Sequence, residues 1–290
     1  MDHKNLRWVY LFTLSLVWGS SFILMKKALI GLSPIQVGAL RILISSLFVF
    51  LIGFGRVFKI KKQYWKYLIL NALIGTFFPA FLFAYAIDRI DSSIASILNS
   101  FTPLNTLIFG AVIFSIGFKK RQLLGVIIGF IGTLILILKG AEVNPNQNYY
   151  YAILILIASV GYALNVNIIK KYLHQLDALS ITVANFLIIT IPTLVVFWYT
   201  TSNNNFTFTP QIKESLVYVT VLAVFGTGLA KIMYNRLIQI STPIFSSSVT
   251  YIIPIVAITF GLLDGEKITF LQFFAAAIIL FGVFLVNKAK

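Results

Sequence analysis

The chain has 290 residues, of which 59% are hydrophobic and only 11% are charged. Soluble domains carry about a quarter charged residues, so this composition excludes an ordinary soluble protein and indicates a membrane protein. The chain contains no cysteine, which excludes disulfides and cysteine-based metal sites or nucleophiles. The net charge of +15 is typical of proteins that bind nucleic acid or an anionic membrane surface, and the positions of the charges along the chain decide what it means here.

Ten apolar stretches follow one another along the chain, and the loops between them are too short to hold a soluble domain. A helix needs roughly 20 mostly apolar residues to cross a bilayer. We therefore predict an all-α integral membrane protein with ten transmembrane helices, of which the fifth is short for a span. In chain order the stretches are Leu6–Leu29, Pro34–Phe54, Tyr67–Ile87, Ser93–Phe114, Leu123–Leu138, Tyr150–Ile169, Leu179–Tyr199, Leu216–Ile238, Pro243–Leu263 and Ile268–Val286.

The first stretch also resembles a signal peptide, because Lys4 and Arg7 precede it and small residues at 19–21 suggest a cleavage region. We favour a permanent span. The segment VWGSSFILMKK at 17–27 has a counterpart, GYALNVNIIKK at 161–171, where no signal peptide can lie.

Lysine and arginine gather on one side of the predicted spans. If the N-terminus is cytoplasmic, fifteen of the 23 lie in cytoplasmic segments and six in outside segments, while Arg41 and Lys231 lie within spans. This bias follows the positive-inside rule and predicts that both termini are cytoplasmic. The basic charge therefore reflects membrane orientation. We expect a multi-pass protein of the cell (inner or plasma) membrane and no nucleic-acid partner.

The two halves of the chain repeat one pattern, in which Lys26-Lys27 of the first half corresponds to Lys170-Lys171 of the second. Each repeat holds five spans, and an odd number reverses the orientation of the second half. We therefore predict two inverted five-helix units, residues 1–140 and 147–290, with a site at their interface and alternating access across it. Duplication for stability alone is the other interpretation. Further matched positions are Trp18 with Tyr162, Arg41 with Asn185, Gly75-Thr76 with Gly226-Thr227, and Pro103 with Pro254.

Arg41 and Lys231 are charged residues inside predicted spans, where each costs about 2.5–3.5 kcal/mol on insertion scales. Such residues usually face the interior of the bundle, although long side chains can also reach the membrane surface. No Asp or Glu lies within a predicted span. We therefore expect no embedded carboxylate proton relay, and a cavity that suits a carboxylate or phosphate better than a cationic drug.

Polar and aromatic residues near Pro103 and Pro254 complete the candidate site. Each proline removes a backbone hydrogen bond and bends its helix, so we interpret both as gating positions. Polar side chains there can instead bond across helices, and aromatic ones can pack in the core or at the membrane interface. The candidate substrate-binding residues are Trp18, Arg41, Tyr85, Asn99, Tyr162, Asn185, Lys231, Thr250 and Tyr251.

The fifth stretch contains the glycine pattern GVIIGFIG at 125–132. It does not fit a nucleotide-binding loop, because no strand precedes it and no lysine follows. Small residues four apart instead predict close helix packing, with Gly282 of the last stretch as a candidate partner. His3 and His174 lie at predicted membrane edges without metal-ligand spacing. We expect neither an enzyme nor a metal or cofactor.

Several short motifs occur together along the chain: WGSSF at 18–22, ALR at 39–41, GTGLA at 226–230, TYIIPIVAITFG at 250–261 and DGE at 264–266. As a set they resemble the EamA-type ten-helix transporters of the drug/metabolite transporter superfamily over essentially the whole length. The resemblance implies two inverted five-helix bundles with cytoplasmic termini. It also implies a central cavity lined by the third, fourth, eighth and ninth helices, with help from the first and sixth. Members move small metabolites, often exporting amino acids or related compounds.

Two positions depart from the family pattern. Gly117-Phe118-Lys119 stands where many members end the fourth helix with Gly-Glu, and Lys231 stands where many carry an uncharged or aromatic residue. Because of the second departure, the resemblance to the family does not identify the transported substrate.

We expect a secondary-type transporter of small polar metabolites, amino-acid-like or organic-anion, with export favoured over import. In this interpretation the two cationic residues orient a carboxylate, the aromatic residues enclose the rest of the substrate, and Asn99, Asn185 and Thr250 supply hydrogen bonds. Its partners would be the small-molecule substrate and the lipid bilayer, with the chain a monomer or weak homodimer. A passive facilitator or channel, and a membrane scaffold or sensor without transport, stay open as alternatives.

Overall fold

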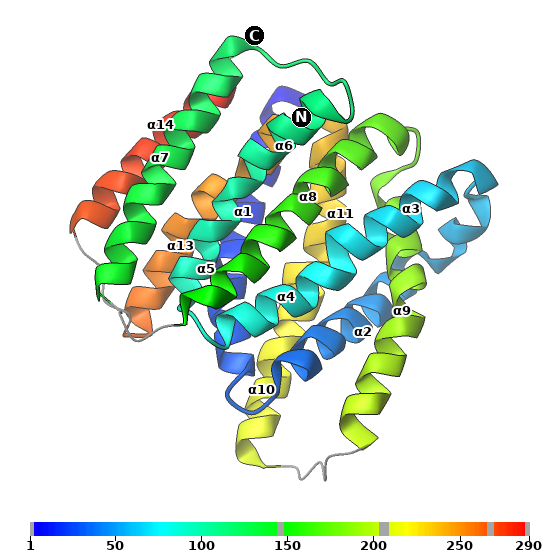
Figure 1. The fold of residues 1–290 in the computed structure, drawn as a ribbon. Helices are drawn as coiled ribbons and strands as arrows, with labels where there is room; N and C mark the ends of the chain where they lie inside the picture. The colour runs from blue at the N-terminus through cyan, green and yellow to red at the C-terminus, as the bar shows by residue number, and fades with distance from the viewer. Residues whose placement is uncertain (1–2, 144–147, 203–208, 266–269, 288–290) are drawn as a thin grey trace.

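The computed structural model describes residues 3–143, 148–202, 209–265 and 270–287, which form a bundle of helices without a strand among them (Figure 1). Eight helical stretches within these residues are long and apolar enough to cross a membrane. They correspond to eight of the ten predicted stretches. The total of ten spans, the inversion of the halves and the side of the termini stay predictions.

The first half contains α1 (His3–Ala28), α2 (Pro34–Gly53), α3 (Trp65–Ala72), α4 (Phe78–Ile87), α5 (Ser92–Leu98), α6 (Thr102–Val112) and α7 (Lys120–Val143). The short 3-10 segments are η1 (Phe54–Lys59), η2 (Lys62–Tyr64) and η4 (Asn99–Phe101), and a π-helix, η3 (Leu73–Phe77), joins α3 to α4.

The second half begins with the 3-10 turn η5 (Tyr149–Tyr151) and α8 (Ala152–Tyr172). It continues with α9 (Ala178–Ser202), α10 (Pro210–Val221), α11 (Ala230–Ile240), α12 (Pro243–Ser247), α13 (Val249–Leu263) and α14 (Phe270–Asn287). A second π-helix, η6 (Leu222–Leu229), joins α10 to α11.

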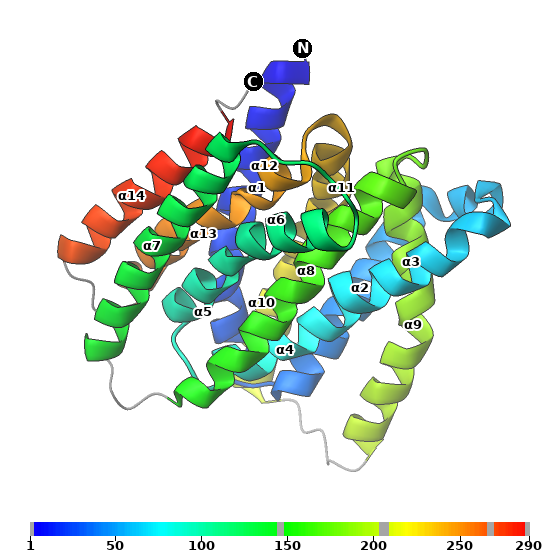
Figure 2. The same ribbon diagram turned by 45° about the horizontal axis from the view of Figure 1, so that its top comes forward.

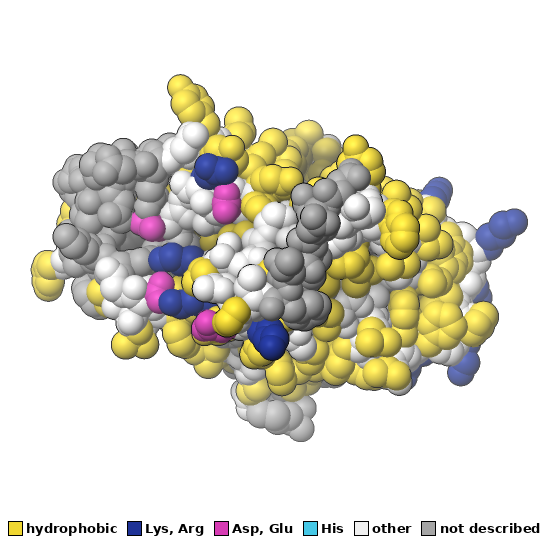
Figure 3. All heavy atoms as spheres, turned by 90° about the horizontal axis from the view of Figure 1, so that it is seen from below, with side chains coloured by type: hydrophobic (Ala, Val, Ile, Leu, Met, Phe, Trp, Pro, Cys, Tyr) yellow, Lys and Arg dark blue, Asp and Glu magenta, His cyan; other side chains and the backbone are white. Residues whose placement is uncertain are grey.

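Large apolar side chains lie on the outside of this bundle, including Leu51 and Leu263 at 80% exposure each. Soluble monomers rarely expose contiguous apolar surface on this scale, whereas a lipid-facing surface requires it. At one end of the bundle, charged side chains of both signs gather over part of the surface, and hydrophobic side chains cover much of the rest (Figure 3). The first described turn of α1 and the last turn of α14 lie at the opposite end (Figure 2).

Pro103 and Pro254 affect their helices in different ways. Pro103 lies in the first turn of α6, directly after the 3-10 turn that ends α5, so the helix path is interrupted there. Pro254 lies inside α13, which continues through it. A proline leaves the carbonyl four residues before it without its usual donor. In both helices a hydroxyl group donates to this carbonyl instead. Thr102 donates to the Asn99 carbonyl (2.7 Å), and Ser100 donates to the Thr250 carbonyl (2.7 Å).

The predicted packing of the fifth and last stretches is confirmed. Helices α7 and α14 lie side by side in both ribbon views (Figures 1 and 2). A Cβ atom added to Gly282 would lie 2.6 Å from the Gly125 carbonyl oxygen and 2.6 Å from the Gly129 nitrogen. The glycines therefore allow the two backbones to touch, as small residues do in membrane helix pairs.

A second glycine, Gly161 of α8, lies against the backbone of η3. A Cβ atom there would lie 2.5 Å from the carbonyl oxygen of Ile74, which cannot move without shifting the π-helix. Overpacking of this kind typically costs about 1–3 kcal/mol. We expect Gly161→Ala to lower the melting temperature of the detergent-purified protein by several degrees.

The matched control is Gly117→Ala, where an added Cβ meets no atom of the described residues within 4 Å. This change should leave the melting temperature unchanged or slightly raised, because alanine restricts the unfolded chain. Equal melting temperatures for the two variants would contradict the close contact between α8 and η3.

Candidate functional site

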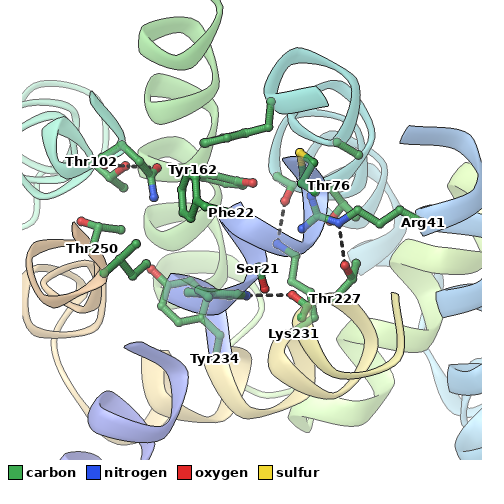
Figure 4. A pocket seen from close by; sticks show the side chains of 18 of the residues that line it. Ser21, Phe22, Arg41, Thr76, Thr102, Tyr162, Thr227, Lys231, Tyr234 and Thr250 are labelled. Atoms are coloured by element: carbon green, nitrogen blue, oxygen red, sulfur yellow. Dashed lines mark hydrogen bonds between the residues drawn. The ribbon is translucent and has the colours of Figure 1, made fainter. Parts of the chain in front are cut away.

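A cavity lies within the bundle between helices of both halves (Figure 4). It holds about 820 Å³ of space between atoms, including the part that opens to the surroundings. Its lining comes from α1, α2, α4, α8, α11 and α13, from both π-helices, and from the η4–α6 junction. The family resemblance did not include the second span among the helices that line the cavity, but Arg41 of this span lines it.

The two π-helices bring their Gly-Thr pairs, Gly75-Thr76 and Gly226-Thr227, to the same cavity. A π-helical turn is wider than an α-helical one and often occurs at functional sites. Both glycine carbonyls accept a hydrogen bond from a lining side chain: Gly75 from Lys231 Nζ at 2.6 Å, and Gly226 from Trp18 Nε1 at 2.8 Å. The irregular backbone thus fixes the position of a cation and of an aromatic ring.

The cavity is positively charged on one side. Arg41 Nε donates to Thr227 Oγ1 at 2.6 Å, which leaves the two terminal guanidinium nitrogens without a protein acceptor in the described ranges. The Lys231 ammonium is 5.8 Å from the centre of the Tyr162 ring, and the residue is only 8% exposed. Thr76 Oγ1 lies in the same wall and has no hydrogen-bond partner among the described residues.

Aromatic rings line the middle part of the cavity. Trp18 contacts Tyr234 edge to face, with ring centres 4.9 Å apart. Phe83 packs between Phe22 and Tyr162, with ring centres at 5.9 Å and 5.8 Å. These rings supply an apolar surface that can cover the body of a small organic molecule.

The side opposite Arg41 is polar but neutral, with Thr102 and Thr250 facing the space (Figure 4). Thr102 Oγ1 donates to Asn99, and Thr250 Oγ1 donates to the Ser247 carbonyl at 2.9 Å. Neither Asp nor Glu occurs among the lining residues of the described part of the chain. The described lining therefore supplies no counter-charge to Arg41 and Lys231 inside the cavity.

Six of the nine predicted site residues line this cavity: Trp18, Arg41, Asn99, Tyr162, Lys231 and Thr250. They come from six different helical segments that lie far apart in the sequence. Their roles in binding stay predictions, but their convergence is a property of the fold.

Tyr85 does not line the cavity and is 39% exposed. Successive residues of an α-helix are about 100° apart, so Tyr85 lies on the face of α4 opposite to the lining residues Phe83 and Ile87. Its prediction as a pocket residue is therefore not supported by its position.

Asn185 and Tyr251 are buried but lie outside the cavity lining. Asn185 belongs to α9, which packs against α2 and α11; its short side chain does not reach the space that the long side chain of Arg41 enters from α2. Tyr251 points from α13 toward α7, where its hydroxyl donates to the Val126 carbonyl at 3.3 Å. Its ring would meet a Cβ placed on Gly129, so it acts as a packing residue.

Several lining residues were not predicted, notably Thr76, Thr227 and Tyr234. Two signals in the sequence could have identified them. The threonines belong to the Gly-Thr pairs that align between the halves, and Tyr234 follows Lys231 by three residues, which places both on one face of a helix.

The two ends of the cavity differ. Met25 and Ile87 extend the lining toward the end of α1. Their counterparts in the repeat, Ile169 and Ile238, are fully buried and do not line it. At this second end Lys170 joins α8 to the end of α11, because its Nζ donates to the carbonyls of Ile238 (3.2 Å), Gln239 (3.3 Å) and Ser241 (2.5 Å).

An ion pair joins α1 to the end of α13 at the other end of the cavity. Asp264 pairs with Lys27 and, at 3.3 Å, with Lys26. The hydrogen bond from Lys27, aided by Lys26, holds the pKa of the Asp264 carboxyl below its usual range. Gly265 follows with a φ of 88°, a conformation that favours glycine and allows the chain to turn after α13. The lysine pairs of the two halves thus have different partners, a carboxylate for Lys26-Lys27 and backbone carbonyls for Lys170-Lys171.

A bundle of apolar helices around an internal cavity is typical of a multi-pass membrane protein. The sequence matches the EamA-like transporter family twice, over residues 6–138 and 150–288. The chain belongs to this family, within the drug/metabolite transporter superfamily, and is thus a membrane transporter protein by family.

Among similar proteins, YedA of Escherichia coli strain K12, named an uncharacterized inner membrane transporter, is 27% identical, with 97% of this chain and 90% of that protein covered. An S-adenosylmethionine/S-adenosylhomocysteine transporter of Chlamydia muridarum is 22% identical, covering 89% and 84%. A solved crystal structure shares the fold with a TM-score of 0.74 at 15% identity, covering 96% of this chain and 94% of that one.

Proposed function

We propose that this protein is a secondary-type transporter that moves small organic anions across the cell membrane by alternating access between two inverted halves. One observation carries the proposal: Arg41 and Lys231 enter a single cavity between the halves, and no acidic side chain lines it in the described residues. Export is the direction that the family resemblance favours. The substrate class includes carboxylate-bearing metabolites, both amino-acid-like compounds and other organic acids.

The arrangement of the two cations supports recognition of a carboxylate. Because Thr227 occupies only Nε, the two terminal nitrogens of the guanidinium stay available. Their N–H bonds point in parallel and match the two oxygens of a carboxylate. Lys231 donates one hydrogen to Gly75 and retains two others. In a site shielded from water, such charge-assisted bonds are stronger than neutral ones, and a bound anion offsets the cost of burying both cations.

The first test is a melting-temperature screen of the detergent-purified protein against organic acids, amino acids, sugar phosphates and organic cations. A ligand that binds only the folded state stabilises it by about 2.7 kcal/mol at a hundredfold excess over Kd. Stabilisation by anions is expected, and stabilisation by cations alone would contradict the proposal.

The second test uses the identified anion in proteoliposomes with an imposed ion or proton gradient. Accumulation against the anion's own gradient is expected of a secondary transporter. Saturable flux that never runs uphill would identify a passive facilitator, and binding without flux would identify a sensor or scaffold.

A further inference from the structure

We propose that the cavity selects organic acids without an ammonium group, such as 2-hydroxy acids with an apolar side chain, over the α-amino acids of the same shape. This inference rests on the proposed function and narrows its substrate class. It follows from the positions of the two cationic side chains in the cavity and from the fixed position of the α-ammonium group next to the carboxylate in an amino acid.

The first step concerns the position of the α-ammonium group. In an α-amino acid the nitrogen and the carboxylate share one carbon atom, so the nitrogen lies about 2.5 Å from the carboxylate carbon. A carboxylate held by Arg41 and Lys231 therefore brings the ammonium within roughly 5 Å of both cations, where like charges repel strongly in a site shielded from water. The covalent geometry prevents the ammonium from moving to another part of the cavity.

The second step concerns the neighbours available to that ammonium. Among the described lining residues no carboxylate is present to offset its charge. The face of the Tyr162 ring, which could attract a cation, already holds the Lys231 ammonium at 5.8 Å. Thr227 Oγ1 accepts from Arg41 and itself donates to the Leu222 carbonyl at 3.2 Å. The positive side of the cavity thus offers an amino acid no charged partner.

A hydroxyl group in the same position meets a suitable partner. Thr76 belongs to this wall, and its Oγ1 is buried and has no hydrogen-bond partner among the described residues, so a rotation of the side chain toward the cavity presents the oxygen to a ligand (Figure 4). A buried polar atom without a partner costs free energy that a ligand can recover. A hydroxyl both donates and accepts, so it can pair with Thr76 without adding charge.

The remaining lining suits the rest of such a molecule. The rings of Trp18, Phe83 and Tyr234 can cover an apolar side chain. Asn99 and Thr250 on the opposite side are polar and neutral, and so give no counter-charge to an ammonium at the end of a chain. The cavity as a whole therefore complements a molecule with one anionic end and no cationic group.

The experiment compares pairs of ligands that differ only in this group: 2-hydroxy-4-methylpentanoate with leucine, and 3-phenyllactate with phenylalanine. Each is titrated against the full-length protein in detergent by thermal stabilisation, and the pairs are then compared as competitors for uptake into proteoliposomes. We expect the hydroxy acid of each pair to bind about tenfold more tightly or better. In Lys231→Met, both ligands should bind more weakly and the ratio within each pair should fall, because one repelling charge is gone.

The matched control is Lys213→Met, which removes an exposed lysine from α10 and should leave the ratio unchanged. Equal or tighter binding of the amino acids would overturn the selectivity while leaving anion transport in place. A ratio that is the same in Lys231→Met as in the wild type would also overturn it. If no carboxylic acid of either kind binds, the proposed function fails and the selectivity fails with it.

Discussion

Replacing Arg41 with alanine is expected to weaken binding of a carboxylate ligand by at least about 30-fold. Removing one partner of a buried, hydrogen-bonded charge pair costs about 2–5 kcal/mol, and 1.4 kcal/mol corresponds to a factor of ten. Arg41 provides the only guanidinium in the described lining of the cavity, and Thr227 holds it in place through Nε. The measurement is the Kd of 2-hydroxy-4-methylpentanoate from thermal titration of the purified protein.

Two further variants separate charge from geometry. Arg41→Lys keeps the positive charge but loses the paired nitrogens, so its affinity should lie between those of the wild type and the alanine variant. Arg56→Ala removes an arginine that pairs with Asp177 at 3.0 Å outside the cavity, and it should bind like the wild type. An unchanged Kd in Arg41→Ala would remove Arg41 from the binding site.

Replacing Lys170 with methionine is expected to loosen the packing of α8 against the end of α11 and to let water reach this end of the bundle. The Lys170 ammonium donates to three carbonyls at the end of α11, where the helix dipole also favours a positive charge. A hydrogen bond to a charged group contributes about 1.5–3 kcal/mol, so even one such bond corresponds to a tenfold or larger shift between closed and open forms.

The absence of cysteine from the chain makes this opening measurable. A single cysteine in place of Ile238, which is fully buried, should react slowly with a water-soluble thiol reagent. Adding Lys170→Met should raise the labelling rate about tenfold or more. Adding Asp264→Asn instead releases the lysines at the opposite end and should leave labelling slow. An unchanged rate with Lys170→Met would show that this lysine does not hold the end closed.

Arg41 and Lys231 could be singled out from the sequence because the membrane leaves few alternatives for a charge. A lysine or arginine in the middle of an apolar stretch must reach the interior of the bundle or the membrane surface, since lipid offers it no partner. The structure places both in the interior. The same reasoning identified the apolar stretches, because every span must satisfy its own backbone hydrogen bonds within a helix.

The aromatic and amide candidates were harder to sort. A helix that faces lipid on one side and packed helices on the other is apolar all round, so its sequence carries no periodicity that marks the inner face. Tyr85 and Tyr162 are equally plausible in sequence, yet only Tyr162 lines the cavity. Tyr251 lies next to Thr250 in the chain, but the turn of the helix directs it toward α7 instead.

The sequence by itself determined the membrane class, the family and the two cations, because these depend on composition and on residues that lipid tolerates poorly. Only the tertiary structure decided which side chains meet. Thr76 and Thr227 reach the cavity through two π-helical turns whose glycine carbonyls accept hydrogen bonds from Lys231 and Trp18 of distant helices. Both contacts join segments more than 150 residues apart in the chain, so they depend on how the two halves pack and cannot be read from the local sequence of either turn.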